Sequence, residues 1–142
     1  MFDFSKISPN PLHRRYYLYA LGGFAALSLG YLLREQFSQS DALVVLFFGV
    51  FPNLLGSFAT PFILAFLLER RYPMWKALDR LWVFGLVNLF TFGVCLLIEY
   101  GHVVAQLGNW DNNDIFASLV GGLAALALWQ LTRSLFPSAA QG

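Results

Sequence analysis

Four long apolar stretches dominate this chain of 142 residues and limit what it can fold into. A helix of about 20 apolar residues spans the hydrocarbon core of a bilayer. Only 12% of the residues are charged, about half the share typical of soluble domains, and the mean hydropathy is +0.60. The sequence predicts an all-α polytopic membrane protein, a single domain in which four transmembrane helices form a bundle. We expect the helices at residues 16–33, 42–68, 81–100 and 114–132.

The first stretch follows a short basic lead that contains Lys6, Arg14 and Arg15. A secretory signal peptide is the rival interpretation, but its apolar region has only about 7–15 residues and a small-x-small cleavage site follows it. Residues 16–33 are longer and no such site follows, so we expect a membrane helix. We expect Pro9 and Pro11 to keep the lead out of this helix.

The second stretch, residues 42–68, would be about 40 Å long as a helix, which exceeds a hydrocarbon core of about 30 Å. It must tilt, kink or break, and we predict a kink at Pro52 and Pro61. Polar side chains lie beside these prolines at Asn53, Ser57 and Thr60. They can satisfy the carbonyls that the prolines leave free, or they can form a polar notch that binds a ligand.

Small residues recur at intervals of four in two of the stretches, which favours close approach of helices. The first set is Gly22, Ala26 and Gly30; the second is Ala117, Gly121 and Ala125, with Ser118 and Gly122 beside it. We therefore expect the last helix to pack in the centre of the bundle. We also expect Asn88, the one strongly polar residue of the third stretch, to hydrogen-bond to a neighbouring helix. The single cysteine, Cys95, allows no intramolecular disulfide and is predicted to be a buried, inert thiol.

The basic residues are distributed unevenly along the chain. Eight of the nine Lys and Arg residues lie in the lead, in the connection 69–80 and at the C-terminal end; one lies in the link 34–41 and none in the loop 101–114. Because positive residues stay on the cytoplasmic side, we predict a multi-pass protein of the inner (plasma) membrane with both termini cytoplasmic. Tyr72 and Trp75 place the connection 69–80 at headgroup level. No clustered basic face indicates a nucleic-acid partner.

The polar loop between the last two stretches concentrates side-chain chemistry. We predict a ligand-binding polar cluster at the mouth of the bundle, with Asn53 from the second stretch as a further member. Its residues are Glu99, His102, Asp111, Asp114, Ser118 and Asn53. Such a cluster can bind a cation, hold a lipid headgroup or supply an acid and a base. The alternative is a solvated loop in which Asp111 or Asp114 caps the last helix. One His with scattered acids is not a recognised metal site, and we predict no metal and no cofactor.

The run from Glu99 and His102 through Trp110-Asp111 and Asp114 to Ser118 and Gly121 resembles the signature of the VanZ-like membrane family. Glu99, Asp114 and Gly121 match it in kind and spacing. The family usually has Gln, Arg and Asn where this chain has His102, Gly108 and Ser118. A second segment, residues 51–62, resembles divergent small members of the family. It lacks the Asp-Lys and His motif that is typical of the better-known members. The resemblance implies a bacterial inner-membrane protein of the cell envelope, in a family whose founding relative is linked to glycopeptide antibiotic resistance.

Three functions follow as hypotheses. The first is a non-enzymatic protein whose outward-facing polar cluster binds a lipid headgroup, a cell-envelope precursor or a partner subunit, with small-residue helix faces that favour a membrane partner or a homo-oligomer. The second is an enzyme for a lipid-linked envelope substrate, with Glu99 or Asp114 and His102 as acid and base. The third is a small proton-coupled transporter. The absence of a carboxylate near the middle of any span argues against the third.

Overall fold

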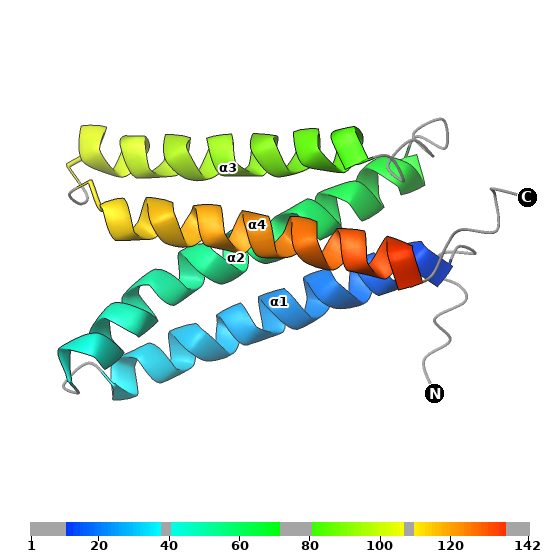
Figure 1. Cartoon of the computed structure of the whole chain (residues 1–142). Coiled ribbons are helices and arrows are strands. Elements are labelled where there is room, and N and C mark those ends of the chain that lie inside the picture. Colours follow the sequence, from blue (N-terminus) through cyan, green and yellow to red (C-terminus); the bar gives the residue numbers. More distant parts are fainter. Residues whose placement is uncertain (1–10, 38–40, 72–80, 107–109, 136–142) are drawn as a thin grey trace, which may run out of the picture.

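The computed structural model describes residues 11–37, 41–71, 81–106 and 110–135, and these form four α-helices without a strand among them (Figure 1). The helices are α1 (Pro11–Gln36), α2 (Ala42–Arg71), α3 (Leu81–Val104) and α4 (Asn112–Leu135). Each is long and apolar enough to cross a membrane, so the predicted four-helix membrane bundle is confirmed. Residues 72–80, which make up most of the predicted headgroup-level connection, lie outside the described residues, as do Lys6, Pro9 and Gly108.

The helices extend beyond the apolar stretches. α1 begins at Pro11 instead of residue 16, so the expectation that Pro11 precedes the helix was wrong. Proline is tolerated in the first turn, where its missing N–H would have no partner within the helix. α3 continues to Val104 and therefore carries both Glu99 and His102. Beyond it, Gln106 adopts a left-handed φ of 56°, which ends the helical geometry.

α2 runs through Pro52 and Pro61 without interruption, which excludes a break. The predicted kink stays a prediction. The Ser57 hydroxyl donates to the carbonyl oxygens of Asn53 and Leu54, at 2.8 and 3.1 Å. The prolines free the carbonyls four residues before them, at positions 48 and 57. The expectation that Ser57 satisfies a freed carbonyl was therefore wrong.

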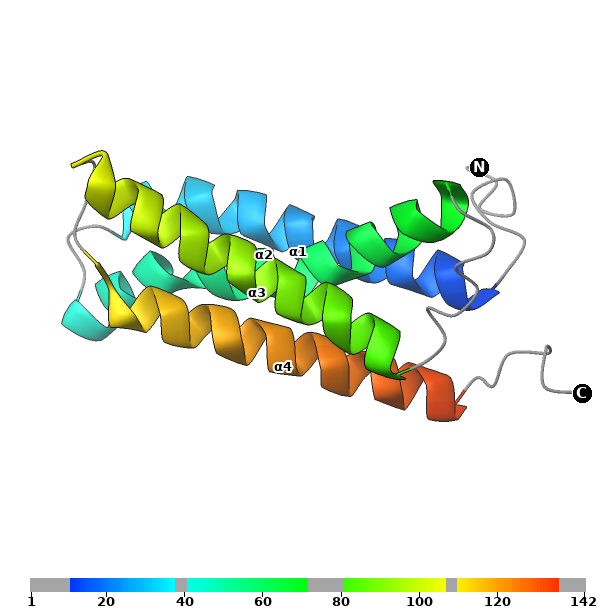
Figure 2. The same ribbon diagram turned by 90° about the horizontal axis from the view of Figure 1, so that it is seen from above.

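α2 and α4 pack at the centre of the bundle. In Figure 1 α2 runs obliquely, from a start beside α1 to an end beside α3, and passes behind α4. It makes the most extensive contacts of the bundle, with α1 and with α4, and it also contacts α3. Figure 2, turned by 90°, shows the same crossing from above. The expectation that α4 packs centrally, with α2 and α3 around it, is confirmed: α4 contacts both and also reaches α1, through a 3.0 Å hydrogen bond between the Tyr19 and Thr132 hydroxyls.

The small residues of α4 form a close contact with α2, as predicted. Ala117, Ser118, Gly121, Gly122 and Ala125 are all buried. A Cβ atom at Gly121 would collide with the Leu54 carbonyl oxygen and the Ser57 hydroxyl of α2. Backbone therefore meets backbone at this crossing, which only glycine permits.

Gly122 faces α3 instead, and the contact there confirms the prediction made for Asn88. The Asn88 side-chain amide, 7% exposed, donates to the Gly122 carbonyl oxygen at 2.7 Å. A side chain at position 122 would strike Asn88 Oδ1, 2.7 Å from the added Cβ. α4 is thus held on both sides through consecutive glycines.

α1 meets α2 through Gly30, a member of the predicted set, and through Gly23, which that set did not include. Gly22 is exposed, and a Cβ added there has no atom within 4 Å. Gly23 faces Ala59 of α2, where an added Cβ would come to 2.7 Å from the Ala59 Cβ, and Gly30 is buried against Phe51. A spacing of seven keeps Gly23 and Gly30 on one seam, whereas successive steps of four rotate around the helix by about 40° each.

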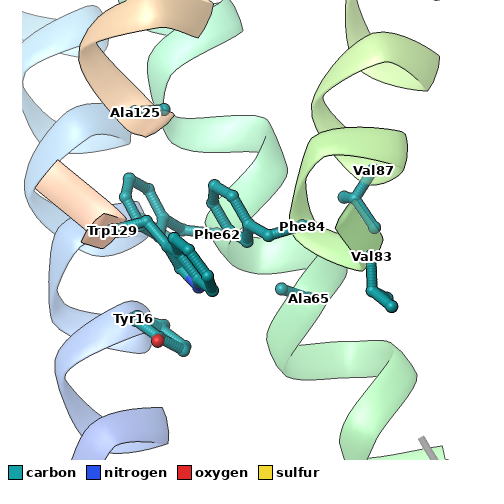
Figure 3. Close-up of a cluster of buried hydrophobic side chains, with 9 residues drawn as sticks. Tyr16, Phe62, Ala65, Val83, Phe84, Val87, Ala125 and Trp129 are labelled. Atoms are coloured by element: carbon teal, nitrogen blue, oxygen red, sulfur yellow. The ribbon is translucent and has the colours of Figure 1, made fainter. Parts of the chain in front are cut away.

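The core lies at one end of the bundle, which we call the aromatic end and define by Tyr16, Phe62, Phe84 and Trp129 (Figure 3). Trp129 and Phe84 stack with centroids 5.2 Å apart, and Phe62 lies 5.4 Å from Phe84 and 5.9 Å from Tyr16. One aromatic ring from each helix thus meets the others. The Arg133 guanidinium covers the outer side, 5.0 Å from the Trp129 ring centroid.

The outer surface is apolar along all four helices. Leu32, Leu43 and Leu97 are 72%, 79% and 69% exposed, and many other large apolar side chains are exposed with them. Contiguous apolar surface on this scale is typical of contact with lipid rather than water. The chain has the build of a multi-pass membrane protein.

Candidate functional site

The predicted cluster forms in part, where α3 ends and α4 begins. We call this region the carboxylate end and define it by Glu99, His102, Asp111 and Asp114. Glu99 lies in the last turns of α3, on the side that faces α4, and is half-buried. Asp114, His102 and Asp111 all lie within electrostatic reach of its carboxylate. The structure therefore brings these four predicted residues together.

Asp111 has a structural role as the N-cap of α4. Its carboxylate accepts a hydrogen bond from the Asn113 backbone N–H at 2.8 Å, and its carbonyl accepts one from the Ile115 N–H. Beside it, the Trp110 indole N–H donates to the Asn112 side chain at 2.9 Å. Capping therefore accounts for Asp111. It leaves Asp114 in the first helical turn, where the helix dipole favours an anion.

Ser118 lies one turn deeper than Asp114 on the same face of α4, and it is buried. The half-buried Cys95 of α3, one turn below Glu99, lies near it. Cys95 and Ser118 thus form the floor beneath Glu99 and Asp114. Sequence reasoning missed this place for Cys95, although its spacing of four from Glu99 puts both residues on one face of α3.

Asn53 does not join the cluster. Its neighbours Leu54 and Ser57 meet α4 at Gly121, which lies seven residues and about 10 Å of helical rise below Asp114. The charged groups that act on Glu99 all come from α3, α4 and the segment just before α4. The prediction that Asn53 shares a site with Glu99 was wrong, because α2 passes α4 nearer the middle of the bundle.

The cluster is anionic and open. His102 is exposed, whereas Asp111 and Asp114 are half-buried like Glu99. Among the described residues, no three His, Cys, Asp or Glu side chains come close enough to hold a metal ion. No described Lys or Arg acts on Glu99; Arg34, in the last turn of α1, is the one described arginine at this end of the bundle. The arrangement leaves three carboxylates, one of them capping a helix, and one imidazole.

A shallow apolar groove of about 510 Å³ lies on another face of α3, toward the same end. It is lined by Phe90, Gly93, Val94, Leu97, Tyr100 and Trp110, with Leu96 between them. Sequence reasoning did not single it out, because apolar residues on the surface of a membrane helix form no distinctive pattern. Its apolar lining suits a lipid acyl chain.

Comparison with known proteins returned no match: no family model, no curated protein and no solved structure is similar to this chain. The resemblance to the VanZ-like family stays a prediction. The fold and the carboxylate end therefore carry the functional argument.

Proposed function

We propose that this chain is a non-enzymatic membrane protein that binds an amine-bearing lipid headgroup at its carboxylate end. The observation behind the proposal is that Glu99 is half-buried beside Asp114 and His102, and no described Lys or Arg neutralises it. Like charges in a small, partly desolvated space repel each other. An ammonium group relieves this repulsion, since it is positive and donates up to three hydrogen bonds.

The place of the cluster along the helices favours a headgroup over a soluble ligand. Glu99 lies 18 residues from the start of α3, about 27 Å of helical rise, which is close to the thickness of a hydrocarbon core. The carboxylates therefore lie at the boundary where headgroups begin. The described side chains of the cluster also do not come close enough together to hold a bare metal ion, whereas a headgroup is larger.

We propose further that the carboxylate end faces away from the cytoplasm. Among the described arginine side chains, four lie at the aromatic end (Arg14, Arg15, Arg71 and Arg133) and Arg34 lies at the other. Positive residues are retained in the cytoplasm, so the aromatic end would face it, in the inner membrane of a bacterium. Labelling of a Gln106→Cys variant by an impermeant maleimide, in a Cys95→Ala background, tests this. Labelling from the outside supports the assignment, and protection until the membrane is opened contradicts it.

The binding test uses the purified protein in nanodiscs that contain phosphatidylethanolamine or phosphatidylglycerol. Native mass spectrometry after ejection counts the lipids retained on the wild type, on Glu99→Gln and on Asp114→Asn. We expect preferential retention of phosphatidylethanolamine by the wild type and its loss in both variants. Asp41→Asn is the matched control, because Asp41 precedes α2 at the same end of the bundle and is not among the charged groups that act on Glu99.

Equal retention of the two lipids by the wild type, or equal phosphatidylethanolamine retention by wild type and Glu99→Gln, would refute a headgroup site here. A cell-envelope precursor or a partner subunit at the same cluster would instead co-purify with the wild type from its membranes and be lost in Glu99→Gln. Chemical turnover of a retained lipid that is lost in His102→Ala would point to the enzymatic alternative.

A further inference from the structure

One face of α2 is left open by the other described helices. We call it the α2 outer face and define it by Gly49, Asn53, Gly56 and Thr60, whose spacings of four, three and four place them on one side of a helix. All four are partly exposed. A Cβ atom added at Gly49 or at Gly56 would have no atom within 4 Å.

The contacts that α2 makes within the chain use its other sides. Phe51 and Ala59 face α1, where they meet Gly30 and Gly23. Leu54 and Ser57 face α4 at Gly121. The α2 outer face is therefore turned outward, toward the surrounding lipid.

Asn53 makes this face unusual, because it lies close to the middle of the bilayer. The candidate span covers Ala42–Leu68, so its midpoint is at residue 55, and Asn53 is about 3 Å from that level. The Asn53 side chain forms no hydrogen bond with any described residue, and neither does the Thr60 hydroxyl. Hydrocarbon supplies no donor or acceptor, so an amide at this depth needs a partner from outside the chain.

Asn88, by contrast, has a hydrogen-bond partner inside the bundle. It is buried, and its amide donates to the Gly122 carbonyl across the contact of α3 with α4. The chain thus contains two intramembrane asparagines in opposite states: one is used inside the bundle, and the other is presented outward between two open glycines.

We propose that the α2 outer face docks against the same face of a second copy, with the two Asn53 side chains hydrogen-bonded to each other across a two-fold axis. An asparagine amide has both donors and an acceptor, so two copies related by a two-fold axis satisfy each other. Two copies of one chain insert with the same orientation, which brings their Asn53 residues to the same depth. Gly49 and Gly56 flank Asn53 and allow the two α2 backbones to approach closely.

Cysteine cross-linking in native membranes tests the contact directly. In a Cys95→Ala background, single cysteines replace Gly49, Gly56 or Gly93. Gly93 is the matched control, since it lies near the middle of α3 and is equally open to an added Cβ. We expect oxidation to give a covalent dimer through position 56 or 49 at least ten times faster than through position 93. Equal rates at the three positions, or no dimer at all, would overturn the proposal.

Energy transfer between two differently labelled copies in liposomes tests the role of Asn53. We expect Asn53→Leu and Gly56→Ile to weaken the association by about 3-fold to 30-fold, the range for one or two interhelix hydrogen bonds in a membrane. Gly93→Ile should leave it unchanged. If Asn53→Leu associates as strongly as the wild type, Asn53 is not at the contact. If the wild-type copies show no energy transfer while another protein co-purifies through Asn53, the partner is not a second copy and the proposal fails.

Discussion

The two ends of this bundle are built from the same four helices but packed in different ways. At the aromatic end, rings from all four helices meet, and Phe62, Phe84 and Trp129 are fully buried. At the carboxylate end, α3 has no buried residue after Thr91, and the residues from Tyr100 to Val104 are all exposed. The aromatic end therefore supplies the stability of the fold, and the carboxylate end can bind a ligand without loss of the fold.

Trp129→Ala should have the largest effect, because it removes the ring that stacks on Phe84 and supports Arg133. We expect the free energy of unfolding to fall by about 3–5 kcal/mol, the range for aromatic truncation in a core. Denaturant titration in mixed micelles measures it. Trp110→Ala, at the carboxylate end, is the control and should cost less than 1 kcal/mol. Equal losses would show that the two ends contribute alike.

Two glycine substitutions sharpen the same comparison. Gly121→Ala forces a methyl group against the Leu54 carbonyl oxygen, and we expect a loss of about 1–3 kcal/mol. Gly101→Ala, on an exposed turn of α3 with no atom within 4 Å of the added Cβ, should be neutral or stabilising by up to about 1 kcal/mol. Thermal unfolding in detergent compares the pair. A larger loss for Gly101→Ala would mean that α3 packs tightly to its end.

Asn88→Ala removes the hydrogen bond to the Gly122 carbonyl. We expect a loss of about 0.6 kcal/mol and at most about 1.7 kcal/mol, the measured range for such contacts in membranes. Association of two copies, measured by energy transfer, should not change. An effect on association equal to that of Asn53→Leu would contradict the assignment of the two asparagines to different contacts.

Glu99→Gln should have the smallest effect on stability, within about 0.5 kcal/mol, since it keeps the shape and removes one charge from a partly open cluster. The same variant should lose the retained lipid. Unfolding and native mass spectrometry on one preparation separate the two readouts. A loss of several kcal/mol would show that Glu99 holds the helices together instead of binding a ligand.

The number of spans and the end of the bundle that carries Glu99, His102, Asp111 and Asp114 were predictable from the sequence, because the lengths of apolar stretches and the parity of crossings decide both. The close contacts were only half predictable. The smooth face around Gly121 follows from its own helix, but whether Gly22 or Gly23 meets α2 depends on how α1 is rotated. The separation of Asn53 from Glu99 depends on where α2 crosses α4. The depth at which two helices cross, and the rotation of each helix about its own axis, depend on both helices of a pair. The pattern of one segment therefore does not determine them.

The oblique course of α2 also has a consequence for biogenesis. α1, which leaves the ribosome earlier, packs along α2 from Phe51 to Phe66, whereas α3 and α4, which also contact α2, are made later. Phe62 therefore has Tyr16 and Tyr19 of α1 as its first partners, and Phe84 of α3 joins some twenty residues later in the sequence. Trp129 of α4 then stacks on Phe84. A chain that stops short of α4 keeps the early hairpin but lacks the Trp129 ring, so the aromatic end is complete only once α4 has packed against it.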